Sequence, residues 1–162
     1  MPHLLYLGNP RKVKEHLSDL LDSAALDLIE REIERNTILL LTLANEHFRF
    51  AIRQPTRHWR QKVSRFYYSG YSAARALRLY IRGEYSTDVK DHQRFDRLPD
   101  EFPGRARYIN QLTMLREDRN MCDYDHLSTL NDLAIGLRET RILVHEFIND
   151  TTQYLHNRGL RV

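Results

Sequence analysis

The sequence contains a single cysteine, Cys122, so no disulfide can form within the chain. Glycine and proline are also scarce, with 6 and 5 residues in a chain of 162. Together with 41% hydrophobic and 29% charged residues, this composition favours a folded, helix-rich protein and argues against an all-β or disordered one. We therefore expect one all-α domain over residues 1–162, which is long enough to bury a hydrophobic core without metals or disulfides.

Several other features are missing from the sequence. No apolar run reaches the roughly 18 residues of a membrane span, and no stretch resembles a signal peptide, so we expect a cytoplasmic protein without a membrane partner. A glycine-rich phosphate loop is absent, and the 8 histidines form no His-x-x-x-His or Glu-x-x-His pair, so we expect neither a cofactor nor a metal. A net charge of +3 permits a polyanionic partner without arguing for one. We expect Cys122, a lone cysteine on a helix, to be a small core residue rather than a nucleophile.

Helical periodicity organises the first half of the chain. Asn9 followed by Pro10 is typical of a helix start, and the apolar spacing predicts a first helix over residues 10–21. A second helix follows from Ser23 and ends before Pro55. Residues 38–41 are apolar on every side of this helix, so other helices should cover them.

The second half follows the same pattern. The stretch from His58 to Gly83 predicts a long helix, and its small residues between 69 and 76 allow a neighbouring helix to approach closely. A polar connector follows, with a short helix predicted over 88–95. A fourth main helix begins near Arg105, and a last helix begins at the cap-like Ser128 and Thr129 and ends at Gly159. Strand-like alternation is hard to find, so we expect an antiparallel up-and-down bundle of four to five helices.

The stretch "MLREDRNMCDYDH", residues 114–126, contains the candidate catalytic residues. On one continuous helix Arg119 and His126 would share a face, roughly 10 Å apart along the axis. If the helix ends near Cys122, His126 lies on the following connection, where a loop can fold it back toward Arg119. Both geometries remain open. An imidazole can move the proton of a 2′-hydroxyl or leaving oxygen, and a guanidinium can hold a phosphate through two hydrogen bonds, which suffices for metal-free RNA cleavage.

The alternative is a solvated helix end with no catalytic role. Between residues 116 and 126, two arginines stand against four carboxylates, and this local excess of negative charge repels a phosphate backbone. A second basic cluster around Trp59 either supplies phosphate affinity or is a solvated helix start with Trp59 buried; it contains Arg53, Arg57, Arg60, Lys62 and Arg65. Tyr67, Tyr68 and Tyr71 are interpreted as core or interface residues rather than as base-stacking groups.

Two stretches resemble a known family. "KVSRFYYSGYSAARAL", residues 62–77, resembles the second main helix of HEPN-domain proteins (higher eukaryotes and prokaryotes nucleotide-binding). "LREDRNMCDYDH", residues 115–126, resembles the signature of that family, an arginine followed by a polar residue and then a histidine, here with six residues between Arg119 and His126. The similarity covers about residues 36–157 and leaves the first helix as an addition.

This resemblance implies a function. HEPN domains are usually dimeric, with two Arg-His sets facing each other, and active members are metal-independent endoribonucleases that act as toxins or antiviral defence effectors. Carried over to this chain, it implies His126 as general acid or base, Arg119 as phosphate clamp and Asn120 as the residue that orients one of them. The expected substrate-binding residues are Arg116, Tyr124 and Arg65, and the expected partners are RNA and a second copy.

The resemblance also leaves alternatives. The run "RNxxDYD" is closest to a HEPN subgroup that often lacks the histidine, whose members are inactive or bind minimal nucleotidyltransferases. The first alternative is therefore a catalytically inactive helical module that binds a nucleotidyltransferase-type antitoxin or another defence protein, and a weaker one is a nucleotide-binding sensor. Some toxins carry a tyrosine just after the histidine as the target of an inactivating nucleotidyltransferase. Tyr124 lies before His126, so that form of regulation is not supported.

Overall fold

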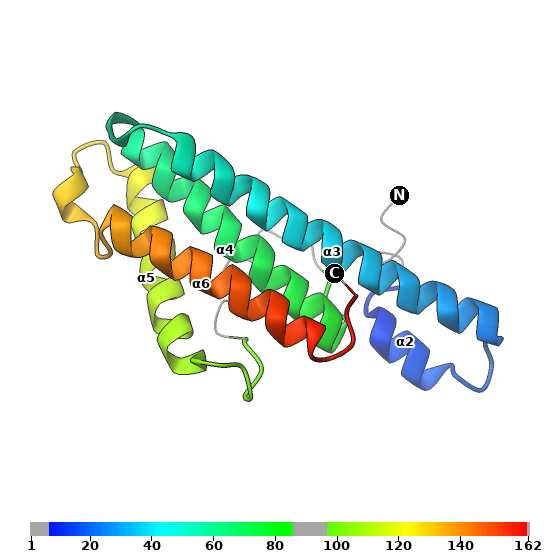
Figure 1. Ribbon diagram of the computed structural model, residues 1–162. Coiled ribbons are helices and arrows are strands. Elements are labelled where there is room, and N and C mark those ends of the chain that lie inside the picture. Colours follow the sequence, from blue (N-terminus) through cyan, green and yellow to red (C-terminus); the bar gives the residue numbers. More distant parts are fainter. Residues whose placement is uncertain (1–6, 86–96, 162) are drawn as a thin grey trace.

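The computed structural model describes residues 7–85 and 97–161, and within these ranges the chain is helical and contains no β-strand (Figure 1). The helices are α2 (Pro10–His16), α3 (Ser23–Arg53), α4 (Trp59–Arg82), α5 (Arg105–Tyr124) and α6 (Leu137–His156). Short 3₁₀ turns precede α4 and α6, namely η1 (Thr56–His58) and η3 (Leu130–Asp132). The prediction of an all-α bundle is confirmed, while the predicted short helix over 88–95 lies outside the described residues.

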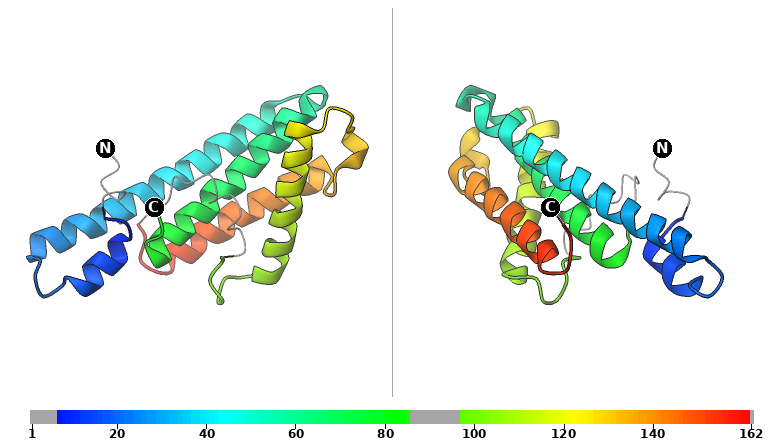
Figure 2. Two further views of the ribbon diagram at one scale, coloured as in Figure 1. Left: turned by 180° about the vertical axis from the view of Figure 1, so that it is seen from behind. Right: turned by 45° about the vertical axis from the view of Figure 1, so that its right-hand side comes forward.

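Helix α4 lies at the centre of the bundle and packs against α3, α5 and α6. Figures 1 and 2 show that α3 runs antiparallel to α4, that α6 lies beside α4 and runs in the same direction, and that α5 crosses the other helices at a steep angle. The steep crossing of α5 brings its C-terminal end against the N-terminal part of α4. Residues near 60–68 and near 119–125 therefore meet in space.

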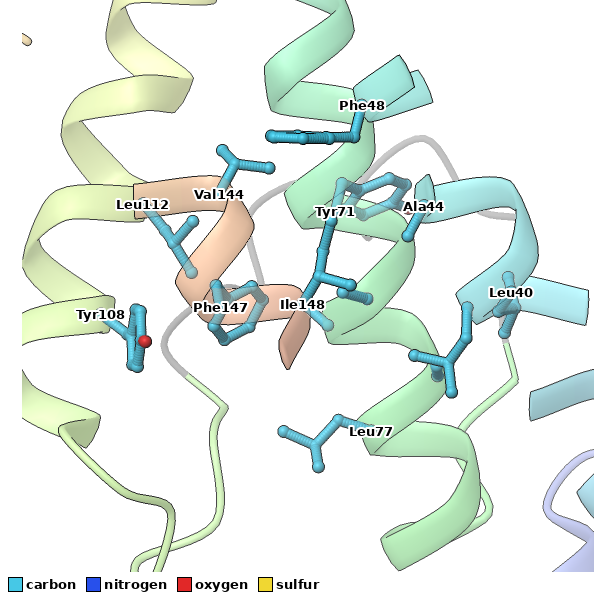
Figure 3. Packing of buried hydrophobic residues seen from close by; sticks show 14 of the residues in the cluster. Leu40, Ala44, Phe48, Tyr71, Leu77, Tyr108, Leu112, Val144, Phe147 and Ile148 are labelled. Atoms are coloured by element: carbon cyan, nitrogen blue, oxygen red, sulfur yellow. The ribbon is translucent and has the colours of Figure 1, made fainter. Parts of the chain in front are cut away.

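The hydrophobic core explains why α4 is central. Its small residues allow close contact, since Ser69 Oγ donates a hydrogen bond of 2.7 Å to the Ala44 carbonyl of α3, and a Cβ at Gly70 would lie 3.3 Å from a methyl group of Leu112 in α5. Figure 3 shows Phe147 of α6 beside Tyr108 of α5, with ring centroids 5.0 Å apart. The expectation that small residues let neighbouring helices approach is confirmed on two sides of α4.

Local signals set several helix ends as predicted. The Asn9 side chain accepts a hydrogen bond from Lys12 N at 3.1 Å, and Pro10 occupies the first turn of α2. Helix α4 ends where Gly83 adopts a left-handed conformation with φ of 66°. A Cβ at Gly83 would lie 2.2 Å from Asn9 Oδ1, so both conformation and space require glycine there.

Two helix ends differ from the prediction. Helix α2 ends at His16 rather than at residue 21, and Leu20, beyond its end, is 81% exposed among the described residues, so its apolar side chain does not extend the helix into the core. Thr129 does cap a turn, through reciprocal hydrogen bonds with Asp132, but this turn is only η3, and α6 begins at Leu137.

The run 38–41 is also less enclosed than expected. Leu40 and Leu41 are buried, whereas Leu39 remains 54% exposed. The reason is that, among the described helices, α4 and α6 pack on one side of α3, and Leu39 does not face them.

Candidate functional site

Arg119 lies in the last part of α5 and points toward α4. Its Nη2 donates a hydrogen bond of 2.9 Å to the hydroxyl of Tyr68, and its guanidinium carbon lies 5.6 Å from the ring centroids of both Tyr67 and Tyr68. Its Nε lies 2.9 Å from Asp123 Oδ2, one helical turn further along α5, in an ion pair whose N–H is not aligned as a hydrogen bond. Arg119 is thus held between two helices, with its side chain 19% exposed.

These contacts also decide the charge of Arg119. Burial lowers its pKa, but the hydrogen bond with Tyr68 and the negative charge of Asp123 outweigh burial, so the pKa is raised above its ordinary value. The guanidinium has five N–H donors, and among the described residues one N–H on each terminal nitrogen has no hydrogen-bond partner. Arg119 therefore remains a permanent cation that can still donate two hydrogen bonds to an anion.

Asn120 and Arg119 lie together, as the sequence predicted from their adjacency. The side-chain oxygen of Asn120 accepts a hydrogen bond of 3.1 Å from Arg119 Nη1, and Asn120 itself is exposed. Its amide group therefore helps to orient the guanidinium.

His126 lies on the turn after α5, because the helix ends at Tyr124. Of the two geometries left open, the histidine on the connection is the one observed. Its side chain is exposed, and within residues 7–85 and 97–161 no hydrogen bond, ion pair or ring contact joins it to Arg119 or to another side chain. The structure brings both residues to the same end of α5, but it does not bring them into contact.

The three predicted substrate-binding residues occupy different positions. Tyr124 is 79% exposed, and its ring centroid lies 5.9 Å from the guanidinium carbon of Arg119. Arg116 lies three residues before Arg119 on α5 and is half-buried. Arg65 comes from α4, where it is exposed and its guanidinium carbon lies 5.1 Å from the centroid of Phe50.

An open pocket of about 400 Å³ lies between α4 and α5, next to Arg119. It is lined by Arg60, Gln61, Ser64, Arg65, Tyr68, Cys122 and Asp123. Asp123 is the acidic residue of this lining, and both of its carboxylate oxygens have partners within the chain. Oδ2 faces Arg119, and Oδ1 accepts a hydrogen bond of 2.9 Å from Ser64. The pocket is polar, partly basic and bordered by the tyrosine that holds Arg119.

Arg60 lines this pocket, but its two terminal nitrogens already donate to the chain itself. Its Nη1 donates to the carbonyls of Cys122 and Asp125, and its Nη2 donates to the carbonyl and the hydroxyl of Ser128, all at 2.7–3.0 Å. The guanidinium carbon also lies 4.7 Å from the Trp59 centroid. Arg60 therefore closes the C-terminal end of α5 and holds the turn that carries His126.

Lys62 also bonds to the backbone, since its ammonium donates a hydrogen bond of 3.0 Å to the Gln54 carbonyl, which follows the end of α3. Of the basic cluster around Trp59, Arg65 is the pocket residue that remains for a ligand, and Trp59 is partly buried against the core rather than fully enclosed.

Three residues of this site were not predicted from the sequence. Asp123 stands four residues after Arg119, a spacing that pairs charges on a helix, so the sequence contained that signal. Tyr68 was interpreted as a core or interface residue, although its hydroxyl holds Arg119. His47 of α3 lies beside Arg65 and Tyr68, and no local pattern indicated that contact.

Metal and thiol chemistry find no support in the described residues. Across residues 7–85 and 97–161, no three His, Cys, Asp or Glu side chains gather in a way that would hold a metal ion. Cys122 is 6% exposed, and burial raises the pKa of its thiol to about 12, as expected for a core cysteine.

Comparison with known proteins identified no relative. No family model, no curated protein and no solved structure matches this chain. Among the described helices, none has the length and apolar character needed to cross a membrane.

Proposed function

We propose that the chain is a metal-independent endoribonuclease of the HEPN type, which acts as a toxin or defence effector and forms its active site at a homodimer interface. The observation that supports this proposal best is the position of Arg119. It is a cation held in one orientation by Tyr68 and Asn120, it retains two donors, and it stands at the end of the helix that leads to His126.

In the proposed reaction Arg119 donates two hydrogen bonds to the scissile phosphate and offsets the charge that develops on it. His126 either takes the proton of the 2′-hydroxyl or gives a proton to the leaving 5′-oxygen, and water carries the other proton. The bond from the 2′-oxygen to phosphorus forms while the bond from phosphorus to the 5′-oxygen breaks. The products are a 2′,3′-cyclic phosphate and a 5′-hydroxyl, and no metal takes part.

The surroundings of His126 support a composite site. Tyr124 and Leu127, on either side of it, are 79% and 78% exposed, and Leu130 on the next turn is 37% exposed. Apolar side chains grouped around an exposed histidine suit a contact between two subunits. In this arrangement the second copy supplies the contacts that orient the imidazole and places a second Arg119 opposite.

The alternative is an inactive helical module that binds a nucleotidyltransferase-type antitoxin or another defence protein through the same surface. One observation favours it: Tyr68, Asp123 and Asn120 already hold Arg119 in place, so its position does not depend on a substrate. Under this reading the Arg119 network stabilises the end of α5, and His126 is a surface residue.

Cleavage of labelled RNA in EDTA separates the two readings. The nuclease predicts products with a 2′,3′-cyclic phosphate from the wild type and loss of cleavage in Arg119→Ala and His126→Ala. Matched controls are Arg138→Ala and His156→Ala, because both residues are exposed on α6, away from the pocket. Full activity of His126→Ala, or no activity in folded wild type, would refute the nuclease.

Mixing the two inactive variants tests the dimer. If the working site combines Arg119 of one subunit with His126 of the other, a mixture of Arg119→Ala and His126→Ala regains part of the activity, because mixed dimers contain one intact site. Sedimentation analysis of the same samples gives the oligomeric state independently. A monomer at all concentrations would contradict the composite site.

A further inference from the structure

His47 connects helix α3 to the candidate site. Its Nδ1 lies 3.4 Å from Arg65 Nη1 of α4, and its ring centroid lies 5.9 Å from that of Tyr68. Tyr68 in turn accepts a hydrogen bond from Arg119 of α5. Three helices thus contribute to one surface around the pocket, and His47 supplies an imidazole to it.

The contact with Arg65 assigns the protonation of His47. A guanidinium can only donate, so Nδ1 must accept, and the ring is neutral with its hydrogen on Nε2. Burial lowers the pKa of His47, the positive charge of Arg65 lowers it further, and Glu46 opposes both. At neutral pH the Nε2–H is therefore an uncharged hydrogen-bond donor next to an arginine.

We infer that His47 and Arg65 form a binding subsite for a backbone phosphate of single-stranded RNA, with the His47 Nε2–H and the remaining N–H groups of Arg65 as donors. The inference rests on the proposed function and adds the class of substrate to it. Within the described residues Arg65 has no carboxylate partner, unlike Arg119, so its positive charge remains for a ligand.

The aromatic residues favour an unpaired strand. Phe50 of α3 is 42% exposed and lies under the guanidinium of Arg65. Tyr124 of α5 is 79% exposed and lies beside Arg119. Each exposed ring therefore stands next to an arginine. Arg65 lines the pocket, and Arg119 is bonded to Tyr68, which also lines it. Rings of this kind stack on unpaired bases, whereas the bases of a duplex are already stacked on each other.

Binding to an RNA that cannot be cleaved tests this inference separately from catalysis. The probe is a fluorescent single strand with 2′-O-methyl groups, which lacks the attacking hydroxyl, and fluorescence anisotropy gives the dissociation constant. We expect Arg65→Ala to weaken binding by roughly tenfold and His47→Ala by roughly fivefold. Arg138→Ala should leave binding unchanged, and a duplex of the same sequence should bind less tightly than the single strand.

Two further variants separate a donor to RNA from a residue that only positions Arg65. In His47→Gln the amide nitrogen replaces Nε2–H, so this variant should retain most of the affinity. In His47→Asn the amide oxygen lies near the position of Nδ1 and can accept from Arg65, but no donor replaces Nε2–H. The affinity of this variant for RNA should therefore stay as low as that of His47→Ala. Rescue by Asn and not by Gln would overturn the donor role.

The two proposals fail in different ways. Wild-type binding that neither His47→Ala nor Arg65→Ala weakens would overturn the subsite even if RNA is cleaved, as would equal affinity for the duplex or no binding at all. Binding with the expected changes in a protein that does not cleave RNA would support the subsite and refute the nuclease. Thermal unfolding of each variant shows that it is folded before its binding is compared.

Discussion

Replacing Arg60 by alanine should destabilise the protein and loosen the turn that carries His126. Arg60 is the residue through which α4 holds the end of α5, since its guanidinium makes four hydrogen bonds to Cys122, Asp125 and Ser128. The Cys122 carbonyl belongs to the last turn of α5, where carbonyls have no partner within the helix and a positive charge is favourable.

The expected loss follows from these contacts. Three of the four hydrogen bonds lie at partly buried positions, and the bond to the Asp125 carbonyl is exposed, where water can replace the lost donor. At about 1 kcal/mol net for each partly buried bond and less for the exposed one, Arg60→Ala should lower the free energy of unfolding by about 3 kcal/mol. In a chain of this size that corresponds to a decrease in Tm of roughly 6–12 °C.

Urea unfolding followed by circular dichroism measures this loss, and hydrogen exchange localises it. Amides of residues 125–128 should exchange faster in Arg60→Ala, while the centre of α4 should change little. Arg60→Lys should fall between the wild type and Arg60→Ala, because one ammonium cannot reach all four acceptors. Arg57→Ala is the matched control, since Arg57 is exposed and its one described hydrogen bond goes to His58. A loss below about 1 kcal/mol for Arg60→Ala, or an equal loss for Arg57→Ala, would refute this reasoning.

Three further predictions concern buried or half-buried groups. Asp118→Ala should lower the free energy of unfolding in urea by about 2–4 kcal/mol, since the Asp118 carboxylate accepts hydrogen bonds from Ala134 N and Ile135 N. Asp118→Asn should lower it less because one acceptor oxygen remains, and equal losses in the two variants would contradict this. Folding lowers the pKa of His47, so as the pH falls below about 6.5 this residue binds a proton in the unfolded chain at a higher pH than in the folded protein. The free energy of unfolding of the wild type should therefore decrease more steeply with falling pH than that of His47→Gln, and parallel pH profiles would contradict this. Cys122 should react with iodoacetamide far more slowly in the folded protein than in urea, because burial raises its thiol pKa to about 12, and equal rates would disprove its burial.

Most of the helices could be predicted from the sequence because their signals are local. Asn9 and Pro10 start α2, Pro55 follows the end of α3, and Gly83 ends α4, each through a conformation or a missing donor within one turn. Thr129 also caps a turn, as its residue type predicts, but a cap indicates only the turn that follows it and not the length of the helix. The chain after that turn follows a different path, in which the backbone N–H groups of Ala134 and Ile135 donate to Asp118 of α5.

The site shows the same division between local and distant signals. Arg119, Asn120 and Asp123 lie within one helical turn, so their association follows from the helix that the sequence predicts. The partners of Arg60 are mainly backbone carbonyls more than 60 residues away, and every residue has a carbonyl, so no side-chain pattern marks them. His47 was one of several scattered histidines until the packing of α3 on α4 placed it beside Arg65.

Local patterns in the chain are enough to predict that it forms helices, where most of them begin and end, and which charged residues lie at the end of α5. The hydrogen bonds of Arg60 to the backbone, the place of Arg65 in the pocket, and the contact of His47 with Arg65 and Tyr68 depend instead on how the helices pack. Caps and charge pairs act within one or two turns, whereas the direction in which α5 crosses α4 results from the packing of the whole core.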